Sequence, residues 1–249
     1  MRGTCRVGFN PVSQKPRAIH LKAAGELGYI PNRAAQQLRK ASRESVAVIT
    51  ASTSNSYYLD LMAGIQHALK PANWTVVVAD VAVDGVYESL LEDRIVRRLI
   101  ESRTAGVIST LTLKPENTKL FANWDIPVVF VDSSPPANAA NFPSVTTDNY
   151  NASLLVGQHL AEHGYKDWTF LVYPTKWSTR FDRERGIRDA ARLHNARVDV
   201  IECDNDSEAA YEALGVHLSK SKPVPQVLIA GNNPLLLGAL KLLRHVNAE

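Results

Sequence analysis

Polar and aromatic residues follow the apolar runs that the 249-residue sequence predicts to be buried strands. The main ones are Tyr57, Tyr58, Thr110, Asp132, Trp177, Thr179, Arg183 and Asn232, and Ser52 and Asn55 also follow the first run. Ligands of open parallel sheets bind beyond the carboxyl ends of the strands, so we expect these side chains to gather around one small-molecule site. The planar fork of Arg183 suits hydroxyl, carboxylate or phosphate acceptors.

Some of these residues also have a purely structural interpretation. Either tyrosine could pack on the sheet at the start of a helix. Asp132 could cap a turn, and Arg183 could pair on the surface with Asp182 or Glu184. Trp177 suits a loop or an interface between lobes better than a specific ligand contact.

The segments that would position these residues alternate between strand-like and helix-like from residue 45 onward, as in parallel β-α-β units. The predicted strands are 46–50, 75–79, 107–109, 128–131, 169–172, 198–202 and 227–230. The predicted helices are 58–69, 89–101, 115–123, 150–163, 179–194, 207–219 and 235–245. A polar, proline-containing passage at 133–143 interrupts the alternation. The sequence therefore predicts an α/β body of two lobes, each with a parallel sheet.

The N-terminal part of the chain predicts two short helices with a break between them. In the first helix, Lys22 and Glu26 form an i,i+4 pair on one face. Gly28 occupies the position where a left-handed helix end is expected, and Pro31 prevents the helix from continuing.

The second helix is expected to begin at Arg33, with Asn32 as its cap. It carries Arg33, Arg39 and Lys40, which suit phosphates, and an apolar stripe that is two turns long and includes Leu38. Isolated helices shorter than about 12 residues are marginal in water, so this helix needs a partner surface in order to fold.

Positive charge is concentrated at the N-terminus. Residues 1–43 hold nine of the 28 lysines and arginines but one of the 25 acidic residues, so this part carries a net charge of +8 and the remainder −5. A basic head is expected of a segment that neutralises nucleic-acid phosphates. A solvated basic tail is the alternative.

Several short motifs follow one another in a fixed order. In the N-terminal part they are Ala23-Ala24, Glu26-Leu27-Gly28-Tyr29, Pro31-Asn32, Ala34-Ala35 and Leu38-Arg39. In the body they are Ser54-Asn55-Ser56-Tyr57-Tyr58, Gly64-Ile65, Pro127 to Asp132, Asp148-Asn149, His159-Leu160, His163-Gly164, Arg183, Gly186, Asn232-Asn233 and Gly238-Ala239-Leu240. Their order and spacing resemble the LacI/GalR family of transcriptional regulators, from about Val12 to the last residue. The family usually has Asp in place of Asn233 and Pro in place of Ser56, so the pocket need not have the chemistry of a known member.

This resemblance implies four domains. They are a partial all-α helix-turn-helix headpiece at 1–31, a hinge helix and linker at 32–44, and two lobes of a periplasmic-binding-protein-like body at 45–143 and 144–249. The chain begins near the end of what resembles the second headpiece helix, and it stops where the family continues with further strands. We therefore expect an incomplete headpiece and an incomplete second lobe.

The resemblance also implies roles for particular residues. Tyr57 and Tyr58 would stack on a sugar ring or base, Asp132 would accept hydrogen bonds from hydroxyls, and Arg183 and Asn232 would hold the ligand from the other lobe. The residues assigned to DNA are Asn32, Arg33, Ala35, Gln36, Leu38, Arg39 and Lys40.

The resemblance implies a DNA-binding transcriptional regulator, and it favours a repressor over an activator. A small polar effector, such as a sugar, a sugar acid or a purine-like molecule, would control its binding to DNA. Two subunits would form a homodimer and bring two hinge helices into the minor groove of operator DNA, where Leu38 enters a base step. The alternative is a sugar-binding receptor body without DNA-binding activity.

Other classes of protein find little support in the sequence. It has no GxGxxG, Walker-type or GxSxG motif, so we expect neither an enzyme nor a cofactor. Cys5 and Cys203 form no metal or disulfide pattern, and His159 and His163 share a helix surface without a third ligand, so we expect no metal site. The sequence has no secretory signal and no apolar run of about 18 residues, which predicts a cytoplasmic protein with no membrane partner.

Overall fold

The computed structural model describes residues 22, 23, 26–28, 45–51, 55–83, 86–139, 141–220 and 225–246. The chain divides into two compact units, Met1–Arg43 and Glu44–Glu249, and each is described by itself. The residues assigned to DNA between 32 and 40, and Ser52, lie outside the described residues.

The described residues of the first unit agree with the predicted helix end. Lys22 and Glu26 form an i,i+4 ion pair of 3.9 Å between Nζ and Oε1. The backbone N–H of Leu27 donates to the carbonyl of Ala23 at 3.0 Å, and Gly28 has a φ of +66°. The predicted side-chain pair and the predicted left-handed glycine are both confirmed.

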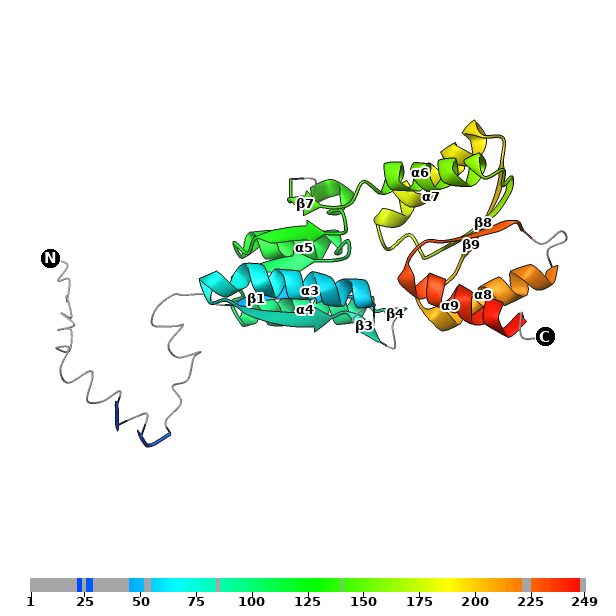
Figure 1. Cartoon of the computed structure of the whole chain (residues 1–249). Coiled ribbons are helices and arrows are strands. Elements are labelled where there is room, and N and C mark those ends of the chain that lie inside the picture. Colours follow the sequence, from blue (N-terminus) through cyan, green and yellow to red (C-terminus); the bar gives the residue numbers. More distant parts are fainter. Residues whose placement is uncertain are drawn as a thin grey trace. The chain divides into compact units, whose positions relative to one another are not determined.

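A five-stranded parallel sheet forms the first lobe of the second unit (Figure 1). Its strands are β1 (Ser45–Thr50), β2 (Thr75–Asp80), β5 (Gly106–Ser109), β6 (Val128–Val131) and β7 (Ser144–Val145), in the order β2-β1-β5-β6-β7. Its helices are α3 (Ser56–Leu69), α4 (Ser89–Glu101) and α5 (Pro115–Asn123), with one-turn 3-10 helices η1 (Lys70–Ala72) and η2 (Ala137–Ala139). Side chains of α4 and α5, including Val96 and Phe121, share one buried cluster with Ile49 and Phe130 of the sheet.

A three-stranded parallel sheet forms the second lobe, in the order β10-β8-β9. Its elements are α6 (Asn149–Glu162), β8 (Asp167–Val172), α7 (Thr179–Leu193), β9 (Arg197–Glu202), α8 (Ser207–Lys220), β10 (Val227–Ala230) and α9 (Asn233–Val246). Successive residues of β8 point to opposite faces of the sheet. Trp168 and Phe170 pack with α7, whereas Leu171 packs in the cluster that includes α8 and α9, which gives three layers.

The strands and helices predicted from residue 45 onward are confirmed, with ends that differ by at most two residues. The helix predicted to begin at Arg33 lies outside the described residues. The elements that the sequence analysis missed are β7 and the antiparallel pair β3 (Ala82–Val83) and β4 (Val86–Tyr87). Two residues are too few to show an alternating pattern, so such strands carry no periodic signal. In the described parts of the chain, every helix falls short of the length and apolar character that a membrane crossing requires.

Strand order explains where a ligand site can form. β1 connects to β2 on one side and β5 lies on its other side, so the chain changes direction between β1 and β5. In the second sheet β8 lies between β9 and β10 in the same way. Such switch points leave a crevice at the carboxyl ends of the strands.

Gly238 allows helices α8 and α9 of the second lobe to pack closely. A Cβ added at Gly238 of α9 would overlap the carbonyl oxygen of Ser207 and approach the Cβ of Ala210 to 2.7 Å. A Cβ at Gly215 of α8 would lie 3.7 Å from Leu242, which is an ordinary contact.

Gly238→Ala is therefore expected to destabilise the protein, because backbone of α8 would have to move to admit the methyl group. The expected cost is about 1–3 kcal/mol of unfolding free energy, measured by urea denaturation. Gly215→Ala is the matched control, and we expect it to be neutral or to stabilise by about 0.5–1 kcal/mol. Equal effects of the two substitutions would contradict this description of the α8–α9 contact.

Candidate functional site

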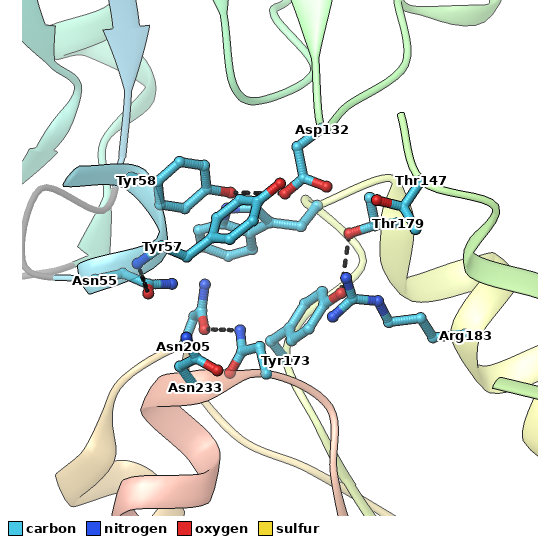
Figure 2. Close-up of a pocket in the computed structure, with 12 residues that line it drawn as sticks. Asn55, Tyr57, Tyr58, Asp132, Thr147, Tyr173, Thr179, Arg183, Asn205 and Asn233 are labelled. Carbon is cyan, nitrogen blue, oxygen red and sulfur yellow. Dashed lines mark hydrogen bonds between the residues drawn. The ribbon is translucent and has the colours of Figure 1, made fainter. Parts of the chain in front are cut away.

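A cavity lies where the carboxyl ends of both sheets meet, and side chains of both lobes line it (Figure 2). The lining residues are Asn55, Tyr57, Tyr58, Asp132, Thr147, Tyr173, Trp177, Thr179, Arg183, Asn205, Asn232 and Asn233. They enclose about 570 Å³ of space not filled by protein atoms, including the part that opens to solvent.

The first lobe contributes two tyrosines and a carboxylate. Asn55 caps α3 by accepting a hydrogen bond from the backbone N–H of Tyr57 at 3.1 Å, which fixes the start of the helix that carries both rings. The rings of Tyr57 and Tyr58 meet edge to face with centroids 5.2 Å apart. Tyr58 is buried and its hydroxyl donates to Asp132 at 3.4 Å, while Tyr57 is 42% exposed. Tyr57 is therefore the ring that remains accessible to a ligand.

The second lobe contributes a guanidinium held by two acceptors. Nε of Arg183 donates to the side-chain oxygen of Asn149 at 2.7 Å, and Nη1 donates to the carbonyl of Gly231. Arg183 also lies 5.9 Å from the centroid of the Tyr173 ring. The hydroxyls of Tyr173 and Thr179 are 2.9 Å apart and hydrogen-bonded. This side of the cavity is thus ordered by contacts within the protein.

Amide side chains form the remaining wall. Asn232 follows β10, accepts a hydrogen bond from the backbone N–H of Leu235 at 3.2 Å and donates to Asn205 at 2.6 Å. Asn233, the first residue of α9, lines the cavity beside them. An amide can both donate and accept, so these groups suit a ligand that has hydroxyls.

Burial sets the protonation of the cavity. It raises the pKa of Asp132 above its usual value, although the nearby Arg183 charge and the Tyr58 hydroxyl act in the opposite direction. Burial likewise raises the pKa values of Tyr58 and Tyr173. The pKa of Tyr57 is raised by burial and then by the Asp132 charge. All three tyrosines therefore remain protonated hydroxyls at neutral pH.

Seven of the eight residues predicted to contact an effector line this cavity. The exception is Thr110, which is buried and donates to the carbonyl of Ile49 at 3.4 Å, and it is not among the lining residues. The alternative in which Arg183 pairs with Asp182 or Glu184 is wrong, since these acids pair with other arginines.

Four lining residues were not predicted from the sequence: Thr147, Tyr173, Asn205 and Asn233. Asn55, which was expected here because it follows the first strand, also lines the cavity. Tyr173 directly follows β8, and Asn205 comes three residues after β9. Both therefore obey the same strand-end rule that identified the others. Thr147 follows β7, which the sequence analysis did not recognise as a strand.

Metal ligands do not gather in the described part of the chain, where no group of three or more His, Cys, Asp and Glu side chains could hold an ion. His159 lies in the last turn of α6 and His163 caps this helix, with ring centroids 4.3 Å apart. The Nδ1 of His163 is 2.8 Å from the carbonyl oxygen of His159.

Comparison with known proteins gives the family. The model of the family described as periplasmic binding proteins and sugar binding domain of the LacI family matches residues 43–248. The HTH-type transcriptional regulator RegA of Clostridium saccharobutylicum is 25% identical over 243 residues, which are 96% of this chain and 71% of RegA. The HTH-type transcriptional repressor CytR of Escherichia coli K12 is 24% identical over 240 residues, 94% of this chain and 69% of CytR. The probable HTH-type transcriptional regulator EndR of Paenibacillus polymyxa is 26% identical, and this chain spans 55% of its length.

Solved structures show the same fold. The lac repressor dimer bound to operator and the anti-inducer ONPF superposes with a TM-score of 0.75 at 21% identity, over 96% of this chain and 71% of that one. The Cra transcriptional dual regulator of Pseudomonas putida in complex with fructose 1-phosphate gives a TM-score of 0.74 at 15% identity, over 82% of this chain and 74% of that one. Because the family model covers most of the sequence, the chain belongs to the LacI family of transcriptional regulators, a non-enzymatic family whose effector-binding body has the fold of periplasmic binding proteins.

Proposed function

We propose that this protein is a transcriptional regulator whose binding to operator DNA, through residues 32–40, is controlled by a small polar effector held in the cavity between the lobes. The observation that carries this proposal is the cavity itself, in which Tyr57, Asp132 and Arg183 converge from two sheets. The basic N-terminal sequence directly precedes the body. We propose that an effector-dependent change in the body alters how this segment contacts DNA.

The effector that fits best is an uncharged molecule with several hydroxyls and one apolar face, such as a neutral sugar or a nucleoside. Among the described lining residues, Arg183 is the only cation, and two of its N–H groups already donate to protein acceptors. A phosphate or carboxylate would also lie near the partly buried carboxylate of Asp132. Like charges in a desolvated site repel each other strongly, so an anionic effector is disfavoured.

A thermal-shift screen of the full chain tests this effector class. Uncharged monosaccharides and nucleosides are expected to include a ligand that raises the melting temperature, because a ligand stabilises the state it binds by RT ln(1 + [L]/Kd). Asp132→Asn should lower the affinity for that ligand by about 10-fold or more, since a hydrogen bond to a charged acceptor contributes about 1.5–3 kcal/mol of binding free energy. Stabilisation by phosphorylated sugars alone would contradict the proposal of a neutral effector.

The DNA contact is proposed for Asn32, Arg33, Ala35, Gln36, Leu38, Arg39 and Lys40. The basic residues would bind phosphates and Leu38 would enter a base step of the minor groove, as in other proteins that bend DNA. A helix this short is stabilised by its contact with the duplex, which couples its folding to DNA binding.

Leu38→Ala is expected to weaken binding to a duplex selected from a random-sequence pool without changing effector affinity, because it removes the proposed wedge and leaves the cavity intact. Arg39→Gln is the companion variant, and it should reduce the slope of log affinity against log salt by about one. Filter binding or fluorescence anisotropy at several salt concentrations measures both. Unchanged duplex affinity for both variants would exclude Leu38 and Arg39 from the DNA contact. A wild-type chain that retains no duplex from the pool but still binds effector would favour a receptor body without DNA-binding activity.

Homodimerisation is proposed through an apolar surface on α3, η1 and β2. Large hydrophobic side chains are exposed there, with Leu59 at 59%, Trp74 at 42% and Val78 at 46%. An exposed apolar surface of this kind marks an interface more often than free solvent contact. Two subunits are also needed to present two hinge helices to a near-palindromic operator.

Leu59→Lys is expected to shift the protein from dimer to monomer, since a charge would be buried at the interface. Leu90, on α4, is 69% exposed, and Leu90→Lys is the matched control that should leave the dimer intact. Light scattering after size-exclusion chromatography reports the mass. A monomeric wild-type chain, or a dimer that survives Leu59→Lys, would exclude this interface.

A further inference from the structure

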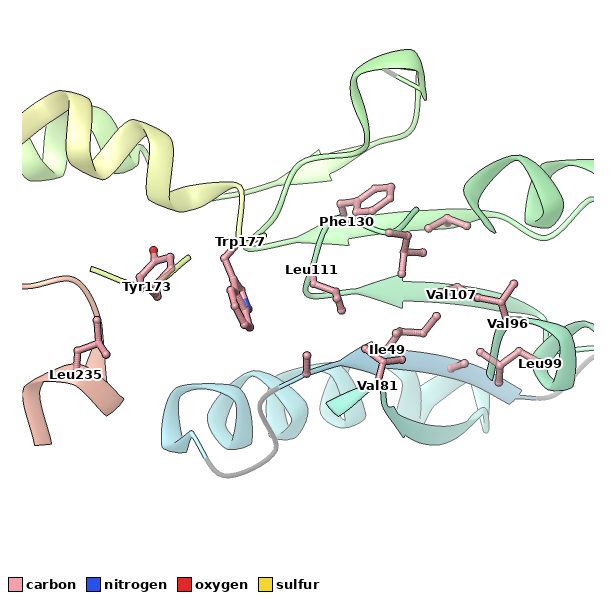
Figure 3. Packing of buried hydrophobic residues seen from close by; sticks show 14 of the residues in the cluster. Ile49, Val81, Val96, Leu99, Val107, Leu111, Phe130, Tyr173, Trp177 and Leu235 are labelled. Atoms are coloured by element: carbon pink, nitrogen blue, oxygen red, sulfur yellow. The ribbon is translucent and has the colours of Figure 1, made fainter. Parts of the chain in front are cut away.

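The segment 174–178, which follows β8, joins the second lobe to the first through three kinds of contact. Trp177 packs in the buried cluster that also contains Leu111, and Figure 3 shows its ring between Leu111 and Tyr173. The Ser178 hydroxyl accepts a hydrogen bond from the backbone N–H of Ser134 at 2.8 Å. The third contact is made by Lys176, which is outside the cavity lining.

The ammonium group of Lys176 lies in a socket on the first lobe that is formed by Tyr87 and Glu92. Nζ lies 3.9 Å from the centroid of the Tyr87 ring and 3.8 Å from Oε2 of Glu92. The lysine side chain is 26% exposed, and that of Glu92 is fully buried. A cation over an aromatic face and beside a buried carboxylate is held more firmly than a cation on an open surface.

The socket is ordered by first-lobe residues. One oxygen of Glu92 accepts hydrogen bonds from the backbone N–H of Lys114 at 2.8 Å and from the side chain of Asn117 at 2.7 Å. The other oxygen accepts from the Tyr87 hydroxyl at 2.6 Å. The side-chain ammonium of Lys114 instead pairs with Asp93 at 2.7 Å. The Lys114 ammonium is thus turned toward Asp93, and the ammonium that lies beside the Glu92 side chain is that of Lys176.

Lys176 is adjacent in sequence to Trp177, which does line the cavity and is 9% exposed. A fixed ammonium therefore limits the positions that the neighbouring indole can adopt. We propose that Lys176 is a positioning residue of the effector site: held between the Tyr87 ring and the Glu92 carboxylate, it fixes segment 174–178 to the first lobe and keeps Trp177 in the cavity wall.

The link to effector binding rests on the proposed function, but the position of Trp177 can be measured without any effector. If no effector were found, the quenching experiment below would still decide whether Lys176 positions Trp177. The two proposals can therefore fail separately.

Acrylamide quenching of Trp177 fluorescence in the full chain provides the test. The fluorescence of Trp177 is obtained by subtracting, from the emission of each protein, the emission of the same protein carrying Trp177→Phe. Lys176→Met removes the charge at similar length, and we expect the quenching constant of Trp177 to rise by about threefold as the segment leaves its socket. Lys176→Arg keeps both the charge and the cation–π contact, so it should restore the wild-type value.

A matched control and an internal monitor separate positioning from general destabilisation. Lys166 donates to the carbonyl of His194 at 2.6 Å within the second lobe, and Lys166→Met should leave Trp177 quenching unchanged. Trp168 is fully buried in the second lobe, so unfolding would expose it as well. Trp74 and Trp124 are exposed, so Trp168 is followed in a background that carries Trp74→Phe, Trp124→Phe and Trp177→Phe, where its quenching should remain low in every variant.

The partner on the first lobe gives a second readout. Tyr87→Leu removes the ring, and we expect it to raise Trp177 quenching as much as Lys176→Met, with no further rise in the double variant. Wild-type quenching in Lys176→Met would overturn the proposal. So would an equal rise in Lys176→Arg, an additive double variant, or a rise accompanied by exposure of Trp168.

Discussion

The contact between the two lobes at Trp177 and Tyr173 is the interaction on which the site depends. These rings belong to the second lobe, yet they share one buried cluster with Ile49, Leu111 and Phe130 of the first lobe. Apolar burial is not directional, so it holds the lobes together without fixing their exact separation. The polar groups around the cavity can then meet a ligand from both sides while the aromatic contact persists.

Parallel topology explains why so much of the site could be predicted. Tyr57, Asp132, Arg183 and Asn232 all follow strand ends, and carboxyl ends of parallel strands share one edge of a sheet. The rule failed for Thr110, which also follows a strand, because its hydroxyl turns back to a strand carbonyl. Position along a strand can be predicted from sequence, whereas the direction of one hydroxyl depends on neighbours that the sequence does not identify.

The contact made by Lys176 shows a different limit of sequence reasoning. Its partners, Tyr87 and Glu92, come from a two-residue strand and the next helix, more than 80 positions earlier in the chain. No local pattern relates such residues. A charged residue in the first turn of a helix, such as Glu92 in α4, would also be expected at the surface from sequence alone, although the structure buries it completely.

The proposed effector cavity in the body and the proposed DNA contact that precedes it are coupled sites, and thermodynamic linkage makes their coupling measurable. The most direct measurement is the affinity of the full chain for its selected duplex across a range of effector concentrations. The account predicts that duplex affinity changes with effector and levels off at saturation, with the duplex altering effector affinity by the same factor. Duplex affinity that stays constant while the cavity fills with effector would contradict it.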